Sequence, residues 1–251
     1  MNEAAALLLA ILTTLGLAAP AAPPPKAIAR GTVGQDVSYP QCGRRLPPRD
    51  TAFGIVGVAG GRPFTANPCL ASQFAWARTT PGGAAFYMNT ANPGSRTPQV
   101  NWYGQRSPDA ACAPGREAAC AYNYGHSAAA AAMAHAQATT GTSTHTMWWL
   151  DVEEANAWSR TDLNANLASI RGSIDYLQRQ PGVSVGIYSV PQMWRKITGG
   201  AQVNLPNWVA GASNLAGARM RCDPKSSFTG GPVVLTQWWV AATYSDMNYA
   251  C

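Results

Sequence analysis

Two acidic residues separated by a single position stand at the end of a short apolar run near the middle of the chain. Residues 147–150 (MWWL) are followed by Asp151, Val152, Glu153 and Glu154. If the run is a β-strand, its side chains alternate between faces, so Asp151 and Glu153 share one face at a spacing of roughly 6.5–7 Å, and Glu154 points away. Carboxyl groups placed together at the end of a buried element can acquire different pKa values. The spacing therefore predicts a catalytic pair.

Acids around one cleft, with neither metal ligands nor a Ser-His pair, are typical of glycoside hydrolases. One acid must hold a proton for the leaving oxygen, and another must be ionised to meet the positive charge that develops on the sugar. Only 12 of the 251 residues are acidic, so an acid at the end of an apolar strand is less readily explained as an ordinary surface residue. The histidines show no metal-ligand spacing and no Cys-x-x-Cys occurs, so we expect no metal and no other cofactor.

The elements that would position these acids alternate between strand and helix. Short apolar runs without polar alternation indicate strands buried on both faces, at 53–59, 84–89, 147–152, 183–188, 207–210 and 233–237, with further strands near Asp36 and at 246–249. Helices are predicted at 70–78, 121–138, about 162–180 and 191–197. About eight strands in roughly 220 residues favour a single α/β barrel of the TIM (β/α) type over an open doubly wound sheet.

Other α/β folds are disfavoured by missing motifs. No Gly-x-Gly-x-x-Gly follows the first strand and no Gly-x-Ser-x-Gly is present, which argues against Rossmann and α/β-hydrolase folds. In a (β/α) barrel the active-site residues lie at the C-terminal ends of the strands. Asp36, Asp151, Glu153 and Asp246 fall at or near such ends on the first, a middle and the last strand, which barrel closure would bring together.

The N-terminal part predicts export. Residues 4–19 are apolar over the length of a signal-peptide core and residues 20–25 are Ala-Pro-rich, so we expect a signal and Pro-rich segment at 1–29 and one barrel domain at 30–251. Because Glu3 precedes the apolar core and no Lys or Arg does, a retained anchor is the alternative. No other stretch is apolar for long enough to span a bilayer. We expect a secreted or cell-wall-associated monomer with no stable membrane insertion after cleavage.

The net charge and the cysteine count indicate which binding partners and which redox environment to expect. The net charge of +6 suits an anionic partner such as a cell-wall polymer, whereas the lack of a basic cluster with interleaved aromatics argues against nucleic acid. Six cysteines in an exported chain favour disulfides. Proximity along the chain predicts the pairs Cys42–Cys69, Cys112–Cys120 and Cys222–Cys251. Residues 93–120, rich in Pro, Gly and Cys, are expected to form a long disulfide-held loop.

Five short motifs resemble, in order, those of the glycoside hydrolase family 25 lysozymes. They are GQDVSYPQ at 34–41, LDVE at 150–153, GIYS at 186–189, WVA at 208–210, and QW at 237–238 followed by DMN at 246–248. The second matches the Asp-x-Glu motif of that family, and the last resembles its closing Gln-(Tyr/Trp) and Asp-x-Asn signature. The resemblance covers nearly the whole chain from Gly34 to Cys251.

The resemblance implies an irregular (β/α) barrel that hydrolyses the β-1,4 bond between N-acetylmuramic acid and N-acetylglucosamine in peptidoglycan. Glu153 would be the proton donor and Asp151 the second carboxylate, in a retaining reaction assisted by the substrate's own acetamido group. The spacing estimated above lies instead near the range of inverting enzymes, and an acetamido nucleophile would explain a wide gap. The substrate-binding residues would be Asp36, Asp246, Tyr39, Tyr188, Trp208 and Gln237.

Two segments depart from the family pattern. Residues 57–62 (GVAGGR) stand where typical members have a Lys-Ala-Thr-Glu-Gly-like segment, and the loop at 93–120 is longer than expected. Both lie where substrate would bind, so substrate specificity is where this chain should differ. The alternatives are a non-catalytic cell-wall glycan-binding protein on the same barrel, a glycosidase for another glycan, and a disulfide-stapled structural protein. The presence of all four acids argues against the first.

Overall fold

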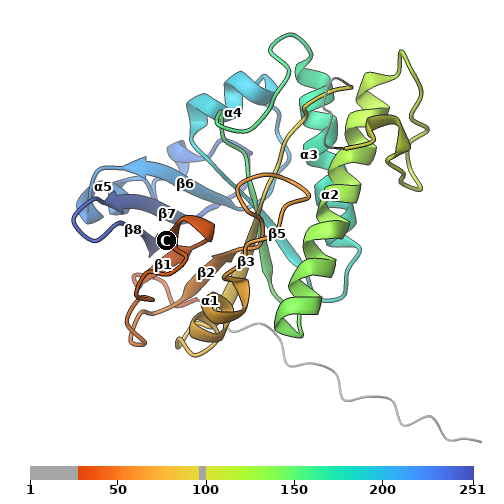
Figure 1. Ribbon diagram of the computed structural model, residues 1–251. Helices are drawn as coiled ribbons and strands as arrows, with labels where there is room; N and C mark the ends of the chain where they lie inside the picture. The colour runs from red at the N-terminus through yellow and green to blue at the C-terminus, as the bar shows by residue number, and fades with distance from the viewer. Residues whose placement is uncertain (1–27, 96–99) are drawn as a thin grey trace, which may run out of the picture.

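The computed structural model describes residues 28–95 and 100–251, which form a closed eight-stranded barrel with helices on its outside (Figure 1). The strands follow one another around the barrel in chain order: β1 (Val33–Val37), β2 (Gly54–Gly57), β3 (Ala84–Asn89), β4 (Met147–Asp151), β5 (Ser184–Ser189), β6 (Asn207–Ala212), β7 (Val233–Val240) and β8 (Ser245–Ala250). The predicted α/β barrel is therefore confirmed. Residues 1–27, which hold the predicted export signal, lie outside the described residues.

The last strand breaks the expected parallel pattern. Neighbouring strands from β1 to β7 pair in parallel, but β8 runs antiparallel to both β7 and β1. The short connection between β7 and β8 has no room for a crossover helix, so the two strands form a hairpin. Closure through β8 places Asp246 directly opposite Asp36.

The connections after β2 to β6 carry the helices. They are α1 (Leu70–Ala77), α2 (Glu117–Thr140), α3 (Leu163–Gln178), α4 (Pro191–Thr198) and α5 (Leu215–Met220). The 3-10 helix η1 (Tyr39–Gln41) follows β1 instead of a longer helix. Asp162 caps α3 by accepting a hydrogen bond from the backbone N–H of Ala165 at 2.9 Å. Helix α5 was not expected from the sequence.

Side-chain alternation along β4 divides the core in two. Trp148 and Leu150 point outward into the layer between the sheet and the helices. Trp149 points into the barrel, where it packs with Trp208, Leu235 and other apolar residues. By the same alternation Asp151 faces the barrel interior, one level above this apolar layer. Strand geometry therefore places a carboxyl group at the C-terminal mouth of the barrel.

Helices α2 and α3 lie side by side along one flank of the barrel (Figure 1). Two glycines allow their backbones to touch. A Cβ on Gly125 would lie 1.8 Å from the carbonyl oxygen of Ser169, and one on Gly172 would lie 2.0 Å from that of Tyr122. Glycine destabilises a helix interior by about 1 kcal/mol relative to alanine, so the close approach is the reason for these residues.

Gly125→Ala is expected to lower the free energy of unfolding by about 1–3 kcal/mol, because the new methyl group meets backbone that cannot rotate away. Gly217→Ala in α5 is the matched control. The nearest atoms to a Cβ there lie 3.6 Å or more away, so helix propensity should dominate and stabilise by about 0.5–1 kcal/mol. Urea unfolding of both variants measures whether each substitution lowers or raises the free energy of unfolding. A stable Gly125→Ala protein would contradict the packing explanation.

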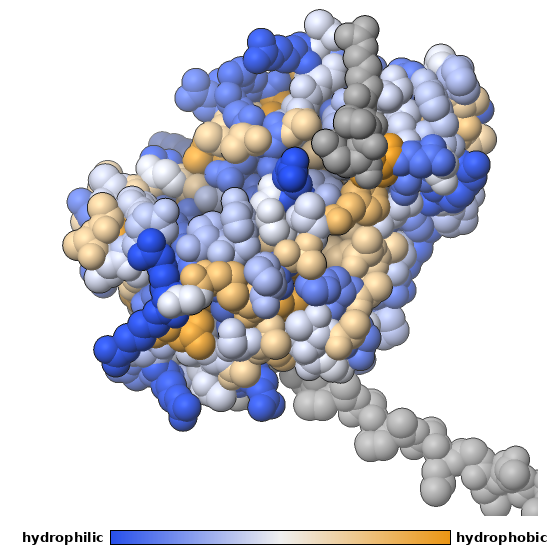
Figure 2. All heavy atoms as spheres, viewed as in Figure 1, coloured by the Kyte–Doolittle hydropathy of each residue, from blue (hydrophilic) through white to orange (hydrophobic). Residues whose placement is uncertain are grey.

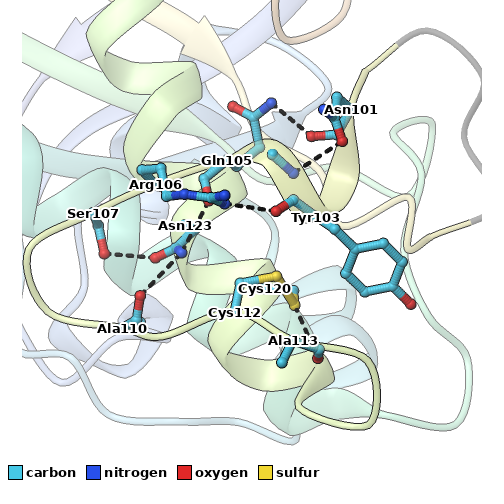
Figure 3. Close-up of a disulfide and its surroundings, with 11 residues drawn as sticks. Asn101, Tyr103, Gln105, Arg106, Ser107, Ala110, Cys112, Ala113, Cys120 and Asn123 are labelled. Carbon is cyan, nitrogen blue, oxygen red and sulfur yellow. Dashed lines mark hydrogen bonds between the residues drawn. A yellow bond between two sulfur atoms is a disulfide. The ribbon is translucent and has the colours of Figure 1, made fainter.

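The three disulfides join the pairs expected from chain proximity, Cys42–Cys69, Cys112–Cys120 and Cys222–Cys251. The second lies where the connection before α2 meets the helix (Figure 3). Beside it, the Asn123 side chain donates hydrogen bonds to the carbonyl oxygens of Gln105 and Ala110 and accepts one from the Ser107 hydroxyl. The described part of this long connection is thus fastened to α2.

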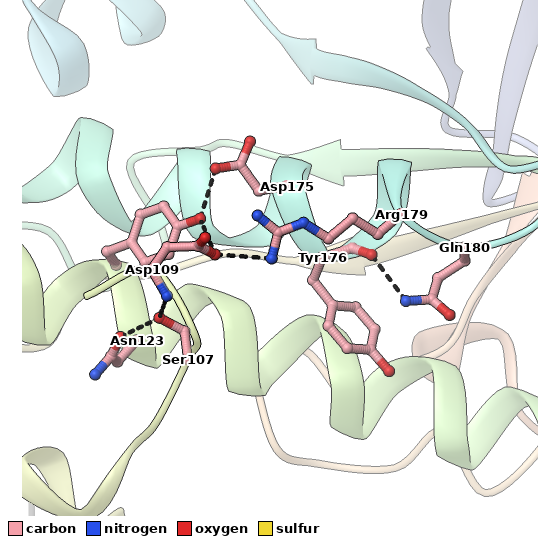
Figure 4. Close-up of polar contacts among 8 residues, drawn as sticks. Ser107, Asp109, Asn123, Asp175, Tyr176, Arg179 and Gln180 are labelled. Atoms are coloured by element: carbon pink, nitrogen blue, oxygen red, sulfur yellow. Dashed lines mark hydrogen bonds and ion pairs between the residues drawn. The ribbon is translucent and has the colours of Figure 1, made fainter. Parts of the chain in front are cut away.

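A polar cluster fastens the same connection to α3 (Figure 4). Asp109 forms an ion pair with Arg179 at 2.7 Å and accepts a hydrogen bond from the Tyr122 hydroxyl, which also donates to Asp175. Both partners of the ion pair are exposed, so we assign the cluster a positioning role and not a large stabilising one.

The molecular surface mixes residue types. On the face shown in Figure 2, strongly hydrophilic side chains lie mostly at the periphery and hydrophobic ones lie between them. Within the part of the chain that the structure describes, no helix is both long and apolar enough to cross a membrane.

Candidate active site

The four predicted acids occupy the C-terminal mouth of the barrel. Asp36 lies on β1, Asp151 is the last residue of β4, Glu153 follows two residues later, and Asp246 lies on β8. Each acid acts electrostatically on another: Asp246 raises the pKa of Asp36, and Glu153 raises the pKa values of Asp151 and Asp246. Barrel closure has brought together acids that lie more than 200 residues apart in the chain.

Asp36 is the most elaborately held of the four. Its side chain is buried, and one carboxylate oxygen accepts hydrogen bonds from Gln237 at 3.0 Å and Asn248 at 2.7 Å. Burial and then the negative charge of Asp246 raise its pKa well above the ordinary value, and the two amide hydrogen bonds oppose this shift. Asp36 is therefore a fixed acceptor at the floor of the site.

Two aromatic side chains determine which way those amides point. The Trp208 indole N–H, which can only donate, bonds the amide oxygen of Asn248 at 2.8 Å. The Tyr188 hydroxyl donates to the amide oxygen of Gln237 at 2.8 Å. Each bond leaves the NH₂ group of the amide directed at Asp36. The orientation of both amides thus follows from donors beneath them.

This arrangement revises the expectation for Trp208. Its side chain is only 2% exposed and packs edge-on against Trp149, Tyr188 and Tyr87 in the barrel interior. The ring is therefore not a surface on which a sugar could stack. Trp208 supports the site from below by orienting Asn248.

Asp151 and Glu153 flank a turn in the chain and do not lie on one continuous strand. Strand β4 ends at Asp151, and the backbone turns at once: the carbonyl oxygen of Glu153 accepts hydrogen bonds from the Trp158 indole at 2.8 Å and from the backbone N–H of Asn156 at 3.1 Å. After this turn the two carboxyl groups lie close enough for each to act on the pKa of the other. Because the strand ends at Asp151, the spacing estimated for a continuous strand does not apply to this pair.

A shared proton explains an otherwise orphaned atom. One carboxylate oxygen of Asp151 accepts a hydrogen bond from Asn89, but the other is buried with no donor unless one member of the pair is protonated. Burial, followed by the charge of Glu153, raises the pKa of Asp151 well above its usual range, and burial also raises the pKa of Glu153. The hydrogen bond between them raises the pKa of Asp151 and lowers that of Glu153. The pair therefore tends to retain one proton at pH values where ordinary carboxyls are ionised.

Asp246 completes the group at the rim. Burial, with a smaller contribution from Glu153, raises its pKa to about 6. Gln41 of η1 lies 3.5 Å from its carboxylate, at the limit of a hydrogen bond. Tyr39, in the same short helix, is 45% exposed, and its ring fits against Gly61, where a Cβ would lie 2.8 Å away. Tyr39 is thus available at the surface as a substrate contact.

Several residues of the site were not singled out from the sequence. Asn89 ends β3 beside Asp151, and Tyr87 on the same strand has its pKa raised by burial and by Asp36, Asp151 and Asp246. Asn248 was seen in the closing motif but not assigned a role. Asn89 could have been found from its position in the sequence, because a polar residue at the end of a buried parallel strand points to the barrel mouth.

Glu154 lies outside the group, as predicted, although β4 ends at Asp151 and the alternation on which that prediction relied does not extend to Glu154. Its carboxylate pairs with Lys196 of α4 at 2.6 Å on the protein surface. Among residues 28–95 and 100–251, no cluster of three or more His, Cys, Asp or Glu side chains has the arrangement of a metal site.

Comparison with known proteins places this barrel among lysozyme-like structures. Residues 119–218, from α2 to α5, match the sequence model of the family described as Lys-1, Lysozyme-like protein 1. The matched segment contains Asp151 and Glu153 but neither Asp36 nor Asp246. No curated protein sequence matches the chain.

Solved structures match over most of the chain. The bacterial lysozyme from Streptomyces coelicolor gives a TM-score of 0.55 at 16% identity, covering 88% of this chain and 92% of that one. A muramidase from Trichobolus zukalii gives 0.53 at 15%, covering 88% and 93%. A family 25 glycosyl hydrolase from Bacillus anthracis gives 0.53 at 10%, covering 88% and 89%. The chain therefore has the fold of the family 25 lysozymes.

Proposed function

We propose that this protein is a secreted N-acetylmuramidase that hydrolyses the β-1,4 bond between N-acetylmuramic acid and N-acetylglucosamine in peptidoglycan. The observation that carries the proposal is the hydrogen-bonded pair Asp151 and Glu153 at the mouth of a lysozyme-type barrel, with Asp36 and Asp246 beside it. A pair that shares one proton provides both an acid and a base near neutral pH, which glycoside hydrolysis requires.

The close pair supports net retention. Inverting enzymes keep their carboxyl groups roughly 6.5–9.5 Å apart to admit a water molecule between them and the sugar. Carboxyls close enough to share a proton would leave no such space. The acetamido oxygen of the substrate would instead attack C1 from the opposite side, while Glu153 donates its proton to the departing glycosidic oxygen. Water would then attack C1, and Glu153 would take the proton of that water.

Substrate binding itself would place the proton on the donor, Glu153. We infer that in the free protein the proton is held mainly by Asp151, the more deeply buried of the two carboxyls. The N–H of a bound acetamido group needs an acceptor, and ionised Asp151 would be a stronger acceptor than the protonated form. Its proton then moves along the existing hydrogen bond to Glu153, where the leaving oxygen requires it. The two carboxyls therefore act as one unit.

Other groups would hold the glycan. Asp36, Asp246, Tyr188 and Gln237 form the polar wall, and Tyr39 lies exposed at the rim. Trp239, 43% exposed and opposite Asp246 on the closing hairpin, would add an aromatic surface for a sugar. Three disulfides support action outside the cell, since such bonds persist in oxidising compartments.

Purified peptidoglycan tests the proposal. The protein should clear a wall suspension and release new reducing ends, and borohydride reduction followed by acid hydrolysis should yield reduced muramic acid. Reduced glucosamine would indicate cleavage of the other glycosidic bond. Sedimentation of the protein with walls, with no new reducing ends from walls or from chitin, would establish the non-catalytic glycan-binding alternative.

A further inference from the structure

We propose that an arginine-aromatic platform at the rim of the barrel binds a free carboxylate on the peptide stem of peptidoglycan. The platform consists of Arg44, in the β1–β2 connection, and of Trp239 and Tyr244, in the β7–β8 hairpin. The guanidinium carbon of Arg44 lies 4.0 Å from the centre of the Tyr244 ring. That ring meets Trp239 edge-on, with centroids 4.8 Å apart. Side chains from the two ends of the chain thus form one continuous stack.

Trp239 joins the platform to the four acids. Gln237 of β7 donates a hydrogen bond to Asp36 inside the mouth, whereas Trp238 packs outside the barrel with residues of α5. Because side chains alternate along a strand, Trp239 faces the same side as Gln237, one level nearer the rim. It also lies directly opposite Asp246. The platform therefore begins where the group of acids ends.

Tyr244 is held in a backbone conformation that ordinarily favours glycine or asparagine. Its φ is +54°, in the left-handed region, at the turn that leads into β8. A bulky residue is strained there and persists only where its surroundings hold it in place. The ring is exposed on the solvent side and lies between Arg44 and Trp239. We assign the tyrosine at this position to the support of the guanidinium.

Arg44 has hydrogen-bond donors available for a ligand. Its side chain is exposed and forms no ion pair with a carboxylate in the part of the chain that the structure describes. A guanidinium stacked on an aromatic face still presents a planar fork of N–H donors, which matches a carboxylate in a bidentate manner. The backbone N–H of Arg44 donates to the carbonyl oxygen of Gln41, and the Cys42–Cys69 disulfide fastens the same connection. The platform is therefore built on a braced segment.

Positive charge surrounds Arg44 on this side of the rim. Arg45 is the next residue and is also exposed. Exposed Arg62 lies on the β2–α1 connection, which the same disulfide joins to the β1–β2 connection. Neither 37–49 nor 51–69 contains an Asp or Glu. An anionic group would therefore meet positive charge at this rim, whereas a neutral group would gain nothing from it.

Peptidoglycan carries the matching anion close to the bond that would be cut. Its peptide stem is attached to the lactyl group of N-acetylmuramic acid and has free carboxylates, whereas chitin has none. An extended dipeptide spans roughly 7 Å, and the lactyl group adds to this reach. A stem that leaves a sugar stacked on Trp239 can therefore place a carboxylate at Arg44. The platform would distinguish peptidoglycan from a neutral polymer of N-acetylglucosamine, and this choice of ligand rests on the proposed function.

Muramyl dipeptide, N-acetylmuramyl-L-alanyl-D-isoglutamine, tests the contact, because it has a free carboxylate and no bond between two sugars. Titration should saturably shift the Trp239 indole N–H resonance of the ¹⁵N-labelled protein, a signal assigned from its absence in Trp239→Phe. The same compound with its carboxylate converted to an amide should bind about 3- to 10-fold more weakly. Equal dissociation constants for acid and amide, or no shift with either, would overturn the proposal.

Arg44→Gln should weaken binding of the acid by a similar factor and leave binding of the amide unchanged, because the guanidinium is the partner of the carboxylate. Arg171→Gln is the matched control. Arg171 is exposed on α3, on the far flank of the barrel from β1 and β8 (Figure 1), so it changes the net charge equally without touching the platform. Equal weakening in both variants would show that only long-range charge contributes, and would refute the assignment.

Two further outcomes separate this inference from its neighbours. A response of the Trp239 signal to inorganic phosphate but not to muramyl dipeptide would assign Arg44 to a phosphate polymer of the wall and overturn the stem-peptide proposal. The titrations need no hydrolysis, so a protein that prefers the acid to the amide but releases no reducing ends would keep the platform and lose the enzymatic proposal. An active enzyme with equal affinities for acid and amide would do the reverse.

Discussion

Glu153→Gln is expected to reduce kcat for wall hydrolysis by roughly 10²–10⁴-fold while the protein stays folded. The glutamine amide keeps the shape of the side chain but cannot pass a proton to the leaving oxygen. Its NH₂ group can still donate to Asp151, so the local hydrogen bond survives the change. The rate loss should therefore come from lost chemistry and not from collapse of the site.

Glu154→Gln is the control for charge and side-chain type. Glu154 is the next residue along the chain, but its carboxylate pairs with Lys196 on the surface. An exposed ion pair of this kind contributes roughly 0–1 kcal/mol to stability, so kcat should be unchanged. Reducing-end assays and circular dichroism compare the two variants. Equal activity in Glu153→Gln and wild type would remove Glu153 from the role of donor.

Asp151→Asn is expected to give a protein that is more stable and at least 100-fold less active. The asparagine oxygen can keep the hydrogen bond from Asn89, and the new NH₂ group can donate to Glu153, which pairs the atom left orphaned in the wild type. The variant has no acceptor that becomes charged to receive the acetamido N–H. Activity and stability should therefore move in opposite directions.

The stability gain should depend on pH. Because the folded-state pKa of Asp151 lies above its unfolded value of about 4, ionising it in the folded protein costs stability, and this loss grows as pH rises from about 4 through the folded-state pKa. Removing the carboxyl should raise the free energy of unfolding by about 1 kcal/mol or more at pH 8, or about 2–4 °C in Tm, and by less at pH 4.

Asp50→Asn, at an exposed position, is the matched comparison and should show neither effect. Thermal unfolding at both pH values measures the difference. A destabilised Asp151→Asn protein at pH 8 would mean that the buried carboxylate is stabilised by contacts that the shared proton does not explain.

Much of this site follows from periodicity alone. Apolar runs without alternation predicted strands buried on both faces, and the apolar run at 147–150 correctly predicted that Asp151 ends a buried strand. Chain order then identified Asp36 and Asp246 as acids on the strands that close the barrel. These inferences succeed because strand parity and barrel closure are geometric.

Other features depend on contacts that no local pattern encodes. The antiparallel direction of β8 follows from a short hairpin, and the turn after Asp151 brings Glu153 back onto its partner. The role of Trp208 could not be foreseen, because an aromatic residue in a strand looks the same whether it stacks on a sugar or orients Asn248 from beneath. Such roles depend on side-chain contacts between strands that lie far apart in the sequence.

The shared proton of Asp151 and Glu153 can be tested by measuring the rate of reducing-end release from purified peptidoglycan by wild type, Asp151→Asn, Glu153→Gln and the double variant. If the two carboxyls share one proton and act as a unit, each single variant loses most of the activity, and the double variant is about as slow as the slower single one. Losses that multiply in the double variant, or a single variant with wild-type rate, would show that the two carboxyls do not act as a unit.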